Sequence, residues 1–194
     1  VNNGFAWRGH FENNPPQVPT KENHVGSYRR IINIPDNWDG KQVIAHFGSV
    51  TSNMYLWVNG SYVGYTEDSK VAAEFDITKY LKKGTNLISF QTFRWSDGSY
   101  CEDQDFWRLS GVARECYLYA RDNKVHVEDM HITPNLTKNY EDGEALVKVN
   151  AKGNPIIDFE IFNANGISVL KTKSNFKNRN IGSARFMLRN VKKW

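Results

Sequence analysis

The sequence lacks any long apolar run. No stretch of about 18 apolar residues occurs, and the mean hydropathy is −0.61, so the sequence predicts no membrane span. The first residues, VNNGFAWRGH, show neither the charged nor the apolar segment of a secretory signal peptide. Because the chain begins at Val1 rather than Met, we expect it to be a processed or partial chain.

Cysteine is also scarce: Cys101 and Cys116 are the only two in 194 residues. This number excludes a disulfide framework, and their spacing does not fit the CxxC pattern of metal or redox sites. Free cysteines are often buried, so we expect buried or half-buried thiols. The five histidines have no metal-ligand spacing with Cys or Glu, which argues against a metal site built on them.

A concentrated basic region is missing as well. The net charge of +4 arises entirely after Arg121, because residues 1–121 hold 13 basic and 13 acidic side chains while residues 122–194 hold 12 and 8. The basic residues of the second part are scattered and lack interleaved aromatics. We interpret them as a solvated face and expect no nucleic-acid partner.

The aromatic residues divide the chain at the same place. Of 26 Phe, Trp and Tyr, 20 lie within residues 1–121. A plainer alternation of apolar and polar residues follows near Asp122, with no Gly/Ser-rich or Pro-rich linker. We therefore expect two closely coupled domains, 1–121 and 122–194.

No segment keeps an amphipathic helical pattern for three turns, and the dominant period is two, as in strands. Asn59-Gly60 between two such segments predicts a tight hairpin, and residues 76–81, followed by Gly84, predict one helical turn. The expected strands of the first domain span residues 27–34, 42–47, 53–58, 61–65, 86–93 and 113–120. This pattern predicts an all-β sandwich of jelly-roll type.

Residues 122–194 also show short strands at regular intervals, which is typical of an immunoglobulin-like sandwich. Such a domain needs about 100 residues, whereas 73 are available here. We therefore expect this domain to be incomplete at its C-terminus, with one or two strands missing.

Residues 94–108, RWSDGSYCEDQDFWR, stand out for chemistry because carboxylates and aromatic rings are interleaved. Carboxylates accept hydrogen bonds from sugar hydroxyls and ligate hard cations, while aromatic faces pack on sugar C–H groups. The alternative interpretation is a solvated turn whose carboxylates cap backbone N–H groups or pair with arginines. The acidic residues are Asp97, Glu102, Asp103 and Asp105, and the candidate arginines are Arg94, Arg108 and Arg114.

Two other interpretations of this loop are weaker. The position of Gly98 directly after Asp97 does not fit a calcium-binding loop. A glycosidase acid/base pair would need two carboxylates facing one pocket, and such pairs usually come from different elements of the scaffold.

The chain resembles the bacterial β-galactosidases of glycoside hydrolase family 2. The resemblance rests on residues 94–111 (RWSDGSYCEDQDFWRLSG), 14–20 (NPPQVPT), 55–69 (YLWVNGSYVGYTEDS) and 74–78 (EFDIT). It implies a jelly-roll, galactose-binding-like domain over 1–121, then part of an immunoglobulin-like domain, with a catalytic barrel elsewhere in the protein.

The resemblance also implies site residues. Asp105, in the Glu-Asp-Gln-Asp motif, would bind the galactoside substrate and a Na⁺ ion, and Asn2 would be a second substrate contact. No counterpart of the barrel's catalytic glutamates or of its Mg²⁺ ligands lies in this chain. The implied reaction is hydrolysis of terminal β-D-galactosides with retention, and the chain alone should be inactive.

Two hypotheses follow. In the first, the chain is the non-catalytic N-terminal part of a bacterial, cytoplasmic or periplasmic β-galactosidase, whose partners are a β-galactoside, its own catalytic barrel and further copies in a homo-oligomer. In the second, it is a freestanding carbohydrate-binding β-sandwich without catalysis. The short second domain favours the first hypothesis, because a freestanding sandwich would need to protect its sheet edges.

Overall fold

The computed structural model describes residues 7, 9–102, 109–137, 139–153, 155–175 and 181–193. Strands dominate these residues, and the remaining regular elements are short 3₁₀ helices. The predicted fold class, an all-β jelly-roll sandwich followed by an immunoglobulin-like sandwich, is confirmed. Among the described residues, no helix has the length and apolar character needed to cross a membrane. The chain divides into two compact units, Val1–Arg121 and Asp122–Trp194.

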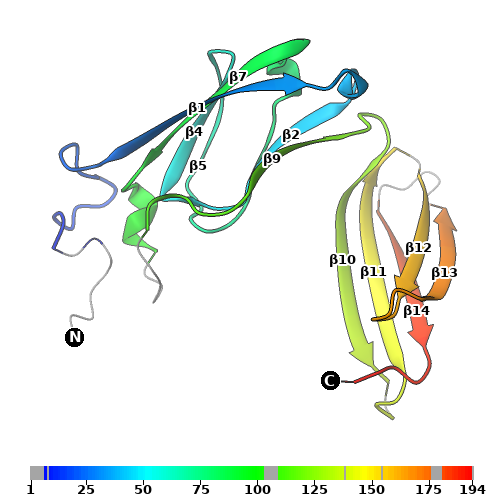
Figure 1. Ribbon diagram of the computed structural model, residues 1–194. Coiled ribbons are helices and arrows are strands. Elements are labelled where there is room, and N and C mark those ends of the chain that lie inside the picture. The colour runs from blue at the N-terminus through cyan, green and yellow to red at the C-terminus, as the bar shows by residue number, and fades with distance from the viewer. Residues whose placement is uncertain are drawn as a thin grey trace. The chain divides into compact units, whose positions relative to one another are not determined.

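The first unit is a sandwich of two antiparallel sheets (Figure 1). Its larger sheet has the order β1 (Val25–Ile34), β7 (Gly84–Phe93), β4 (Asn53–Val58) and β5 (Ser61–Thr66). The other sheet has the order β6 (Ala73–Asp76), β2 (Gln42–Phe47) and β9 (Cys116–Arg121). The short strands β3 (Val50–Thr51) and β8 (Gly111–Val112) pair with each other.

Alternation along β4 shows how the sequence builds this sandwich. Met54, Leu56 and Val58 are fully buried, while Tyr55 and Trp57 lie between them on the opposite face of the sheet. The buried row packs against apolar residues from β2 in the facing sheet. The core therefore lies between the two sheets, and the outer face of β4 is aromatic.

The predicted hairpin is confirmed at Asn59-Gly60, which connects β4 to β5. Both residues adopt positive φ, 51° and 83°, as the tight hairpin turn requires. The Asn59 side chain donates to the Tyr80 carbonyl (2.9 Å) and accepts from the Leu87 N–H (3.0 Å). The turn is thus tied to the neighbouring strand as well as to its own hairpin.

A β-bulge interrupts the pairing of β4 with β5. Leu56 pairs with Gly64 and Trp57 pairs with Tyr62, so Val63 is the extra residue. Val63 packs against the core. Because the bulge shifts the alternation by one position, Tyr62 and Tyr65 both lie on the outer face of the sheet.

The short elements were the ones that the sequence pattern did not predict. Strands β3, β6 and β8 span two to four residues each. Segments this short do not show a recognisable alternation of apolar and polar residues. The predicted helical turn is present as η2 (Thr78–Tyr80), and two further 3₁₀ turns are η1 (Asp36–Trp38) and η3 (Asp97–Tyr100).

The second unit is a smaller sandwich. One sheet has the order β10 (His126–Leu136), β11 (Gly143–Lys152) and β14 (Ile181–Leu188), and β12 (Ile156–Phe162) pairs with β13 (Ser168–Asn175). Its core residues are Val147, Val149, Ala151, Phe159 and Phe186. The two units therefore have separate hydrophobic cores.

The expectation of buried or half-buried cysteines is wrong, because Cys101 and Cys116 are both exposed. Cys101 follows η3 in a loop. Cys116 begins β9, which is an edge strand of its sheet among the described residues, so no neighbouring strand covers its outer side. Partial burial still raises the pKa of the Cys116 thiol.

Candidate functional site

The two residues that the resemblance assigns to the site, Asp105 and Asn2, lie outside the described residues. Asp103 lies outside them too, whereas Asp97 and Glu102 are described. The structure thus describes the chain leading into the acidic loop, up to Glu102, and the chain leaving it, from Leu109.

Trp95 anchors the start of the loop. The Asn23 side chain accepts from the Trp95 N–H (2.9 Å) and donates to its carbonyl (3.1 Å). The preceding Arg94 N–H donates to the His24 carbonyl (2.9 Å). Because Trp95 is only 8% exposed, its backbone groups need such partners in place of water. Asn23 therefore fixes the position from which the loop leaves β7.

The 3₁₀ turn η3 carries the first carboxylate of the loop. Ser96 and Ser99 form a reciprocal capping box in which the Ser96 N–H donates to Ser99 Oγ (3.1 Å). Both serines are buried. The N–H groups of Cys101 and Glu102 then donate to the Gly98 carbonyl (2.9 and 3.0 Å), so hydrogen bonds hold the chain as far as Glu102.

An aromatic cluster supports the loop from the N-terminal side. Trp7 lies 5.3 Å from Tyr100 and Phe11 lies 5.3 Å from Trp95, measured between ring centroids. The Tyr100 hydroxyl accepts from the Asn14 N–H (3.3 Å) and donates to the Gln17 carbonyl. These contacts join residues near the chain's beginning to the acidic loop.

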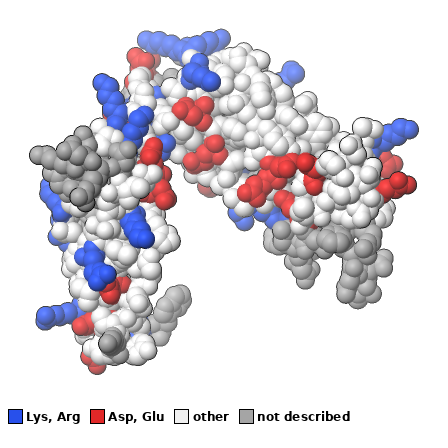
Figure 2. Space-filling model, turned by 180° about the vertical axis from the view of Figure 1, so that it is seen from behind, with Lys and Arg blue, Asp and Glu red and all other residues white. Residues whose placement is uncertain are grey.

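Glu67 brings a further carboxylate to Asp97 and Glu102. Its side chain accepts a hydrogen bond from the Tyr65 hydroxyl and lies against Gly98 of η3. The Tyr65 hydrogen bond lowers the pKa of Glu67, but partial burial and the carboxylates of Asp97 and Glu102 outweigh it, so this pKa lies above its usual value. Figure 2 shows acidic side chains gathered in a patch on the first unit.

The described arginines do not neutralise this cluster. Arg94 lies over the Trp95 ring (5.1 Å), and Arg114 donates to the Lys70 carbonyl (3.0 Å). Within the described ranges, neither Asp97 nor Glu102 forms an ion pair with these arginines. In the described part of the loop, the arginine pairs of the alternative interpretation are therefore not seen, whereas the capping of a backbone N–H is met at Glu102.

Glu102 has its own backbone partner and borders a small cavity. Its carboxylate accepts from the Ser69 N–H (3.1 Å). The cavity, of about 40 Å³, is lined by Thr51, Ser52, Lys70, Arg94, Trp95, Ser99, Glu102 and Ser110. This volume suits water rather than a sugar.

The carboxylates of Glu67, Asp97 and Glu102 are of the chemical type that binds cations, but these three side chains are not arranged as a complete cation site. Carboxylate oxygens are the ligands that hard cations take, and the raised pKa of Glu67 reflects partial burial together with the neighbouring carboxylates of Asp97 and Glu102. In the part of the chain that the structure describes, however, no group of three His, Cys, Asp or Glu side chains is arranged to hold a metal ion.

Sequence reasoning missed Glu67. It lies 30 positions before Asp97 and directly after the strand that contains Tyr65, so nothing local marked it as part of the acidic loop. The segment YTEDS was noted only for its resemblance. A hairpin model that placed the end of β5 beside the end of β7 would have indicated this contact.

Fold and site together define a β-sandwich protein in which the carboxylates of Glu67, Asp97 and Glu102 lie at one end of the first unit, with an aromatic cluster beside η3. The chain belongs to glycosyl hydrolases family 2, since residues 10–122 match the model of its sugar binding domain. The predicted resemblance to the family is thereby confirmed.

Curated relatives are bacterial β-galactosidases. The chain is 46% identical to that of Priestia megaterium over 146 residues, which are 75% of this chain and 14% of the relative. It is 41% identical to that of Leuconostoc mesenteroides over 175 residues, which are 87% of this chain and 17% of the relative. The chain thus spans about one sixth or less of these relatives.

Solved structures share the fold at lower identity. The β-glucuronidase of Bacteroides uniformis matches with a TM-score of 0.74 and 19% identity, covering 89% of this chain and 23% of that chain. The β-glucuronidase of Bifidobacterium dentium matches with a TM-score of 0.71 and 17% identity, covering 89% of this chain and 34% of that chain.

Proposed function

We propose that this chain is the non-catalytic N-terminal part of a β-galactosidase that hydrolyses terminal β-D-galactosides with retention. The observation that carries the proposal is the identity of 38–46% to three bacterial β-galactosidases, over 143–154 residues that make up 74–79% of this chain. In this proposal the chain supplies the substrate-binding residue Asp105.

The anchoring of the loop gives this role a physical basis. Asn23, the Ser96–Ser99 capping box and the Tyr100 hydrogen bonds hold the chain on the entering side of the loop. A substrate contact works best when its supporting backbone is fixed before binding, because less conformational entropy is lost. The Asp105 carboxylate would accept hydrogen bonds from galactose hydroxyls, and the Asn2 amide would provide a second contact.

Asp105 would also hold a Na⁺ ion, which would supply positive charge beside the sugar hydroxyls. The negative charges of the Glu67, Asp97 and Glu102 carboxylates would favour a cation in this region. The ligands for Mg²⁺ would lie in other parts of the full-length enzyme.

Bond making and breaking would be the task of two glutamates in a catalytic barrel outside this chain. This chain alone would therefore be inactive, and its partner would be the remainder of its own polypeptide, in an enzyme that we expect to be a homo-oligomer.

The test compares Asp105→Asn with the exposed control Asp36→Asn in the full-length enzyme, with kcat/KM measured at several Na⁺ concentrations. We expect Asp105→Asn to lower kcat/KM roughly hundredfold, because a misplaced substrate loses orientation, and to abolish the response to Na⁺. Asp36→Asn should match the wild type. If both variants kept the wild-type kcat/KM and Na⁺ response, the proposed role of Asp105 would be wrong.

A further inference from the structure

The outer face of the β4–β5 hairpin carries four aromatic side chains, Tyr55, Trp57, Tyr62 and Tyr65, here called the aromatic face. Ring centroids lie 4.6 Å apart for Tyr55 and Tyr65, 6.2 Å for Tyr55 and Trp57, and 5.9 Å for Trp57 and Tyr62. The four rings therefore form one continuous contact surface.

This face is partly open to solvent although it is aromatic: its two β5 rings are exposed and its two β4 rings are half-buried. Tyr62 is 51% exposed and Tyr65 is 38% exposed. The bulge at Val63 produces the arrangement, because without it Tyr62 and Tyr65, three positions apart, would lie on opposite faces of the sheet. A continuous group of two exposed and two half-buried aromatic rings is uncommon on a surface that binds nothing.

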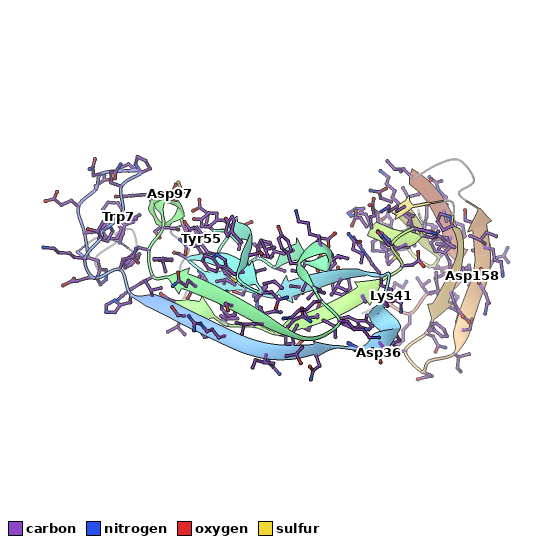
Figure 3. All side chains as sticks on the ribbon, turned by 90° about the horizontal axis from the view of Figure 1, so that it is seen from above. Trp7, Asp36, Lys41, Tyr55, Asp97 and Asp158 are labelled. Carbon is purple, nitrogen blue, oxygen red and sulfur yellow. The ribbon has the colours of Figure 1, made fainter. Side chains whose placement is uncertain are left out.

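The polar neighbours of the aromatic face are amides, hydroxyls and a carboxylate. Gln91 pairs with Tyr55 in the sheet, is exposed, and donates to Ser27 Oγ (3.3 Å). At the other end the Tyr65 hydroxyl donates to Glu67. Figure 3 shows Tyr55 at the same end of the first unit as Asp97, so the face adjoins the carboxylate cluster.

This chemistry favours a neutral carbohydrate over the other possible occupants. Sugar C–H groups pack on aromatic rings, while hydroxyls exchange hydrogen bonds with amides and carboxylates. The carboxylates of Glu67, Asp97 and Glu102 would repel an anionic sugar. They would also disfavour a symmetric contact with a second copy in which the two acidic clusters face each other.

We propose that the aromatic face is a carbohydrate-binding surface for neutral glycans that acts independently of Asp105. A sugar would lie across Tyr55 and Trp57, with Tyr62 and Tyr65 at its sides and its hydroxyls toward Gln91 and Glu67. This surface would give the chain an affinity for oligosaccharides of its own.

The test is a titration of the 194-residue chain with a neutral β-linked galacto-oligosaccharide at millimolar concentrations, followed by NMR. We expect Tyr62→Ala and Trp57→Ala each to weaken binding about tenfold, as loss of an aromatic contact does. Tyr62→Phe keeps the ring and should bind as the wild type does. Tyr117→Ala is the matched control, since Tyr117 is 48% exposed on the other sheet.

The Asp105→Asn variant separates this proposal from the proposed function, because it should keep oligosaccharide binding at the aromatic face. An oligosaccharide with uronic acid units should bind more weakly. The proposal is overturned if the wild-type chain shows no saturable binding, if Asp105→Asn abolishes binding, or if Tyr117→Ala weakens it as much as Tyr62→Ala. Unchanged amide spectra outside the hairpin would show that each variant is folded.

Discussion

At Glu67, a hydrogen bond and the surroundings of the carboxylate act on the pKa in opposite directions. The hydrogen bond from Tyr65 lowers its pKa, yet partial burial and the carboxylates of Asp97 and Glu102 raise that pKa above its usual value. A carboxyl whose pKa is raised on folding binds more protons in the folded chain than in the unfolded chain. Stability therefore falls as pH rises from the ordinary glutamate pKa to the raised value, and stays lower above it.

Replacing Glu67 by Gln should remove this penalty while keeping an oxygen that accepts from Tyr65. We expect Glu67→Gln to raise the free energy of unfolding at pH 7 by about a few tenths of a kcal/mol, because solvent screens the charges, and to raise the Tm accordingly. The difference should vanish below a pH of about 4, where glutamate is protonated in both states. Thermal unfolding from pH 3 to pH 8 measures both effects.

Glu115→Gln, at an exposed glutamate of the same unit, is the control and should leave the Tm unchanged. A Glu67→Gln variant less stable than the wild type at pH 7 would contradict the expectation. It would mean that the carboxylate contributes more as a hydrogen-bond acceptor than it loses by repulsion.

Among the elements, the turn of the β4–β5 hairpin requires a glycine at position 60, because the backbone there has positive φ. Gly60 has φ of 83°, and a Cβ there would meet no atom within 4 Å. The cost of Gly60→Ala is therefore conformational rather than steric, and we expect a loss of about 1–2 kcal/mol. Urea unfolding measures it.

Gly98→Ala is the matched comparison, because its Cβ would meet its nearest neighbour, Ser96 Oγ, at 3.5 Å and its φ is not positive. We expect a change within about 0.5 kcal/mol, as for surface substitutions without special strain. Equal losses at Gly60 and Gly98 would show that backbone conformation is not the cause.

Elements with a strong local signal could be predicted from the sequence. The alternation in residues 42–47 and 53–58 and the Asn59-Gly60 turn each need only neighbouring residues, and the structure has these strands at the same bounds. The bulge at Val63 could not be predicted, because the pairing of two strands decides it. The same holds for Glu67, which reaches the acidic loop through tertiary structure. The assignments of Asp105 and Asn2 stay predictions.

At the scale of the whole molecule, the two separate cores lead to a further expectation. Leu56 is buried in the first unit and Phe186 in the second. Leu56→Ala should cost about 2–5 kcal/mol and Phe186→Ala about 3–5 kcal/mol. Because neither residue belongs to the other core, each loss should appear in its own unit.

Amide hydrogen exchange measures the two units separately. We expect Leu56→Ala to reduce protection in β4 and β7 and to leave β11 unchanged, and Phe186→Ala to do the reverse. The conservative variant Leu56→Met should have a small effect. A uniform loss of protection along the chain would show that the two units unfold as one.

The two hydrogen bonds between the Asn23 side chain and the Trp95 backbone have a consequence for the order of folding. The two residues are 72 positions apart, which at about 5–20 residues per second corresponds to roughly 4–14 seconds of synthesis. Strand β1 cannot pair with β7 until that strand has been synthesised, 50 to 68 positions later, whereas the β4–β5 hairpin closes locally. The strand made first is thus among the last to pair, and the entrance to the acidic loop is fixed only when the sandwich closes.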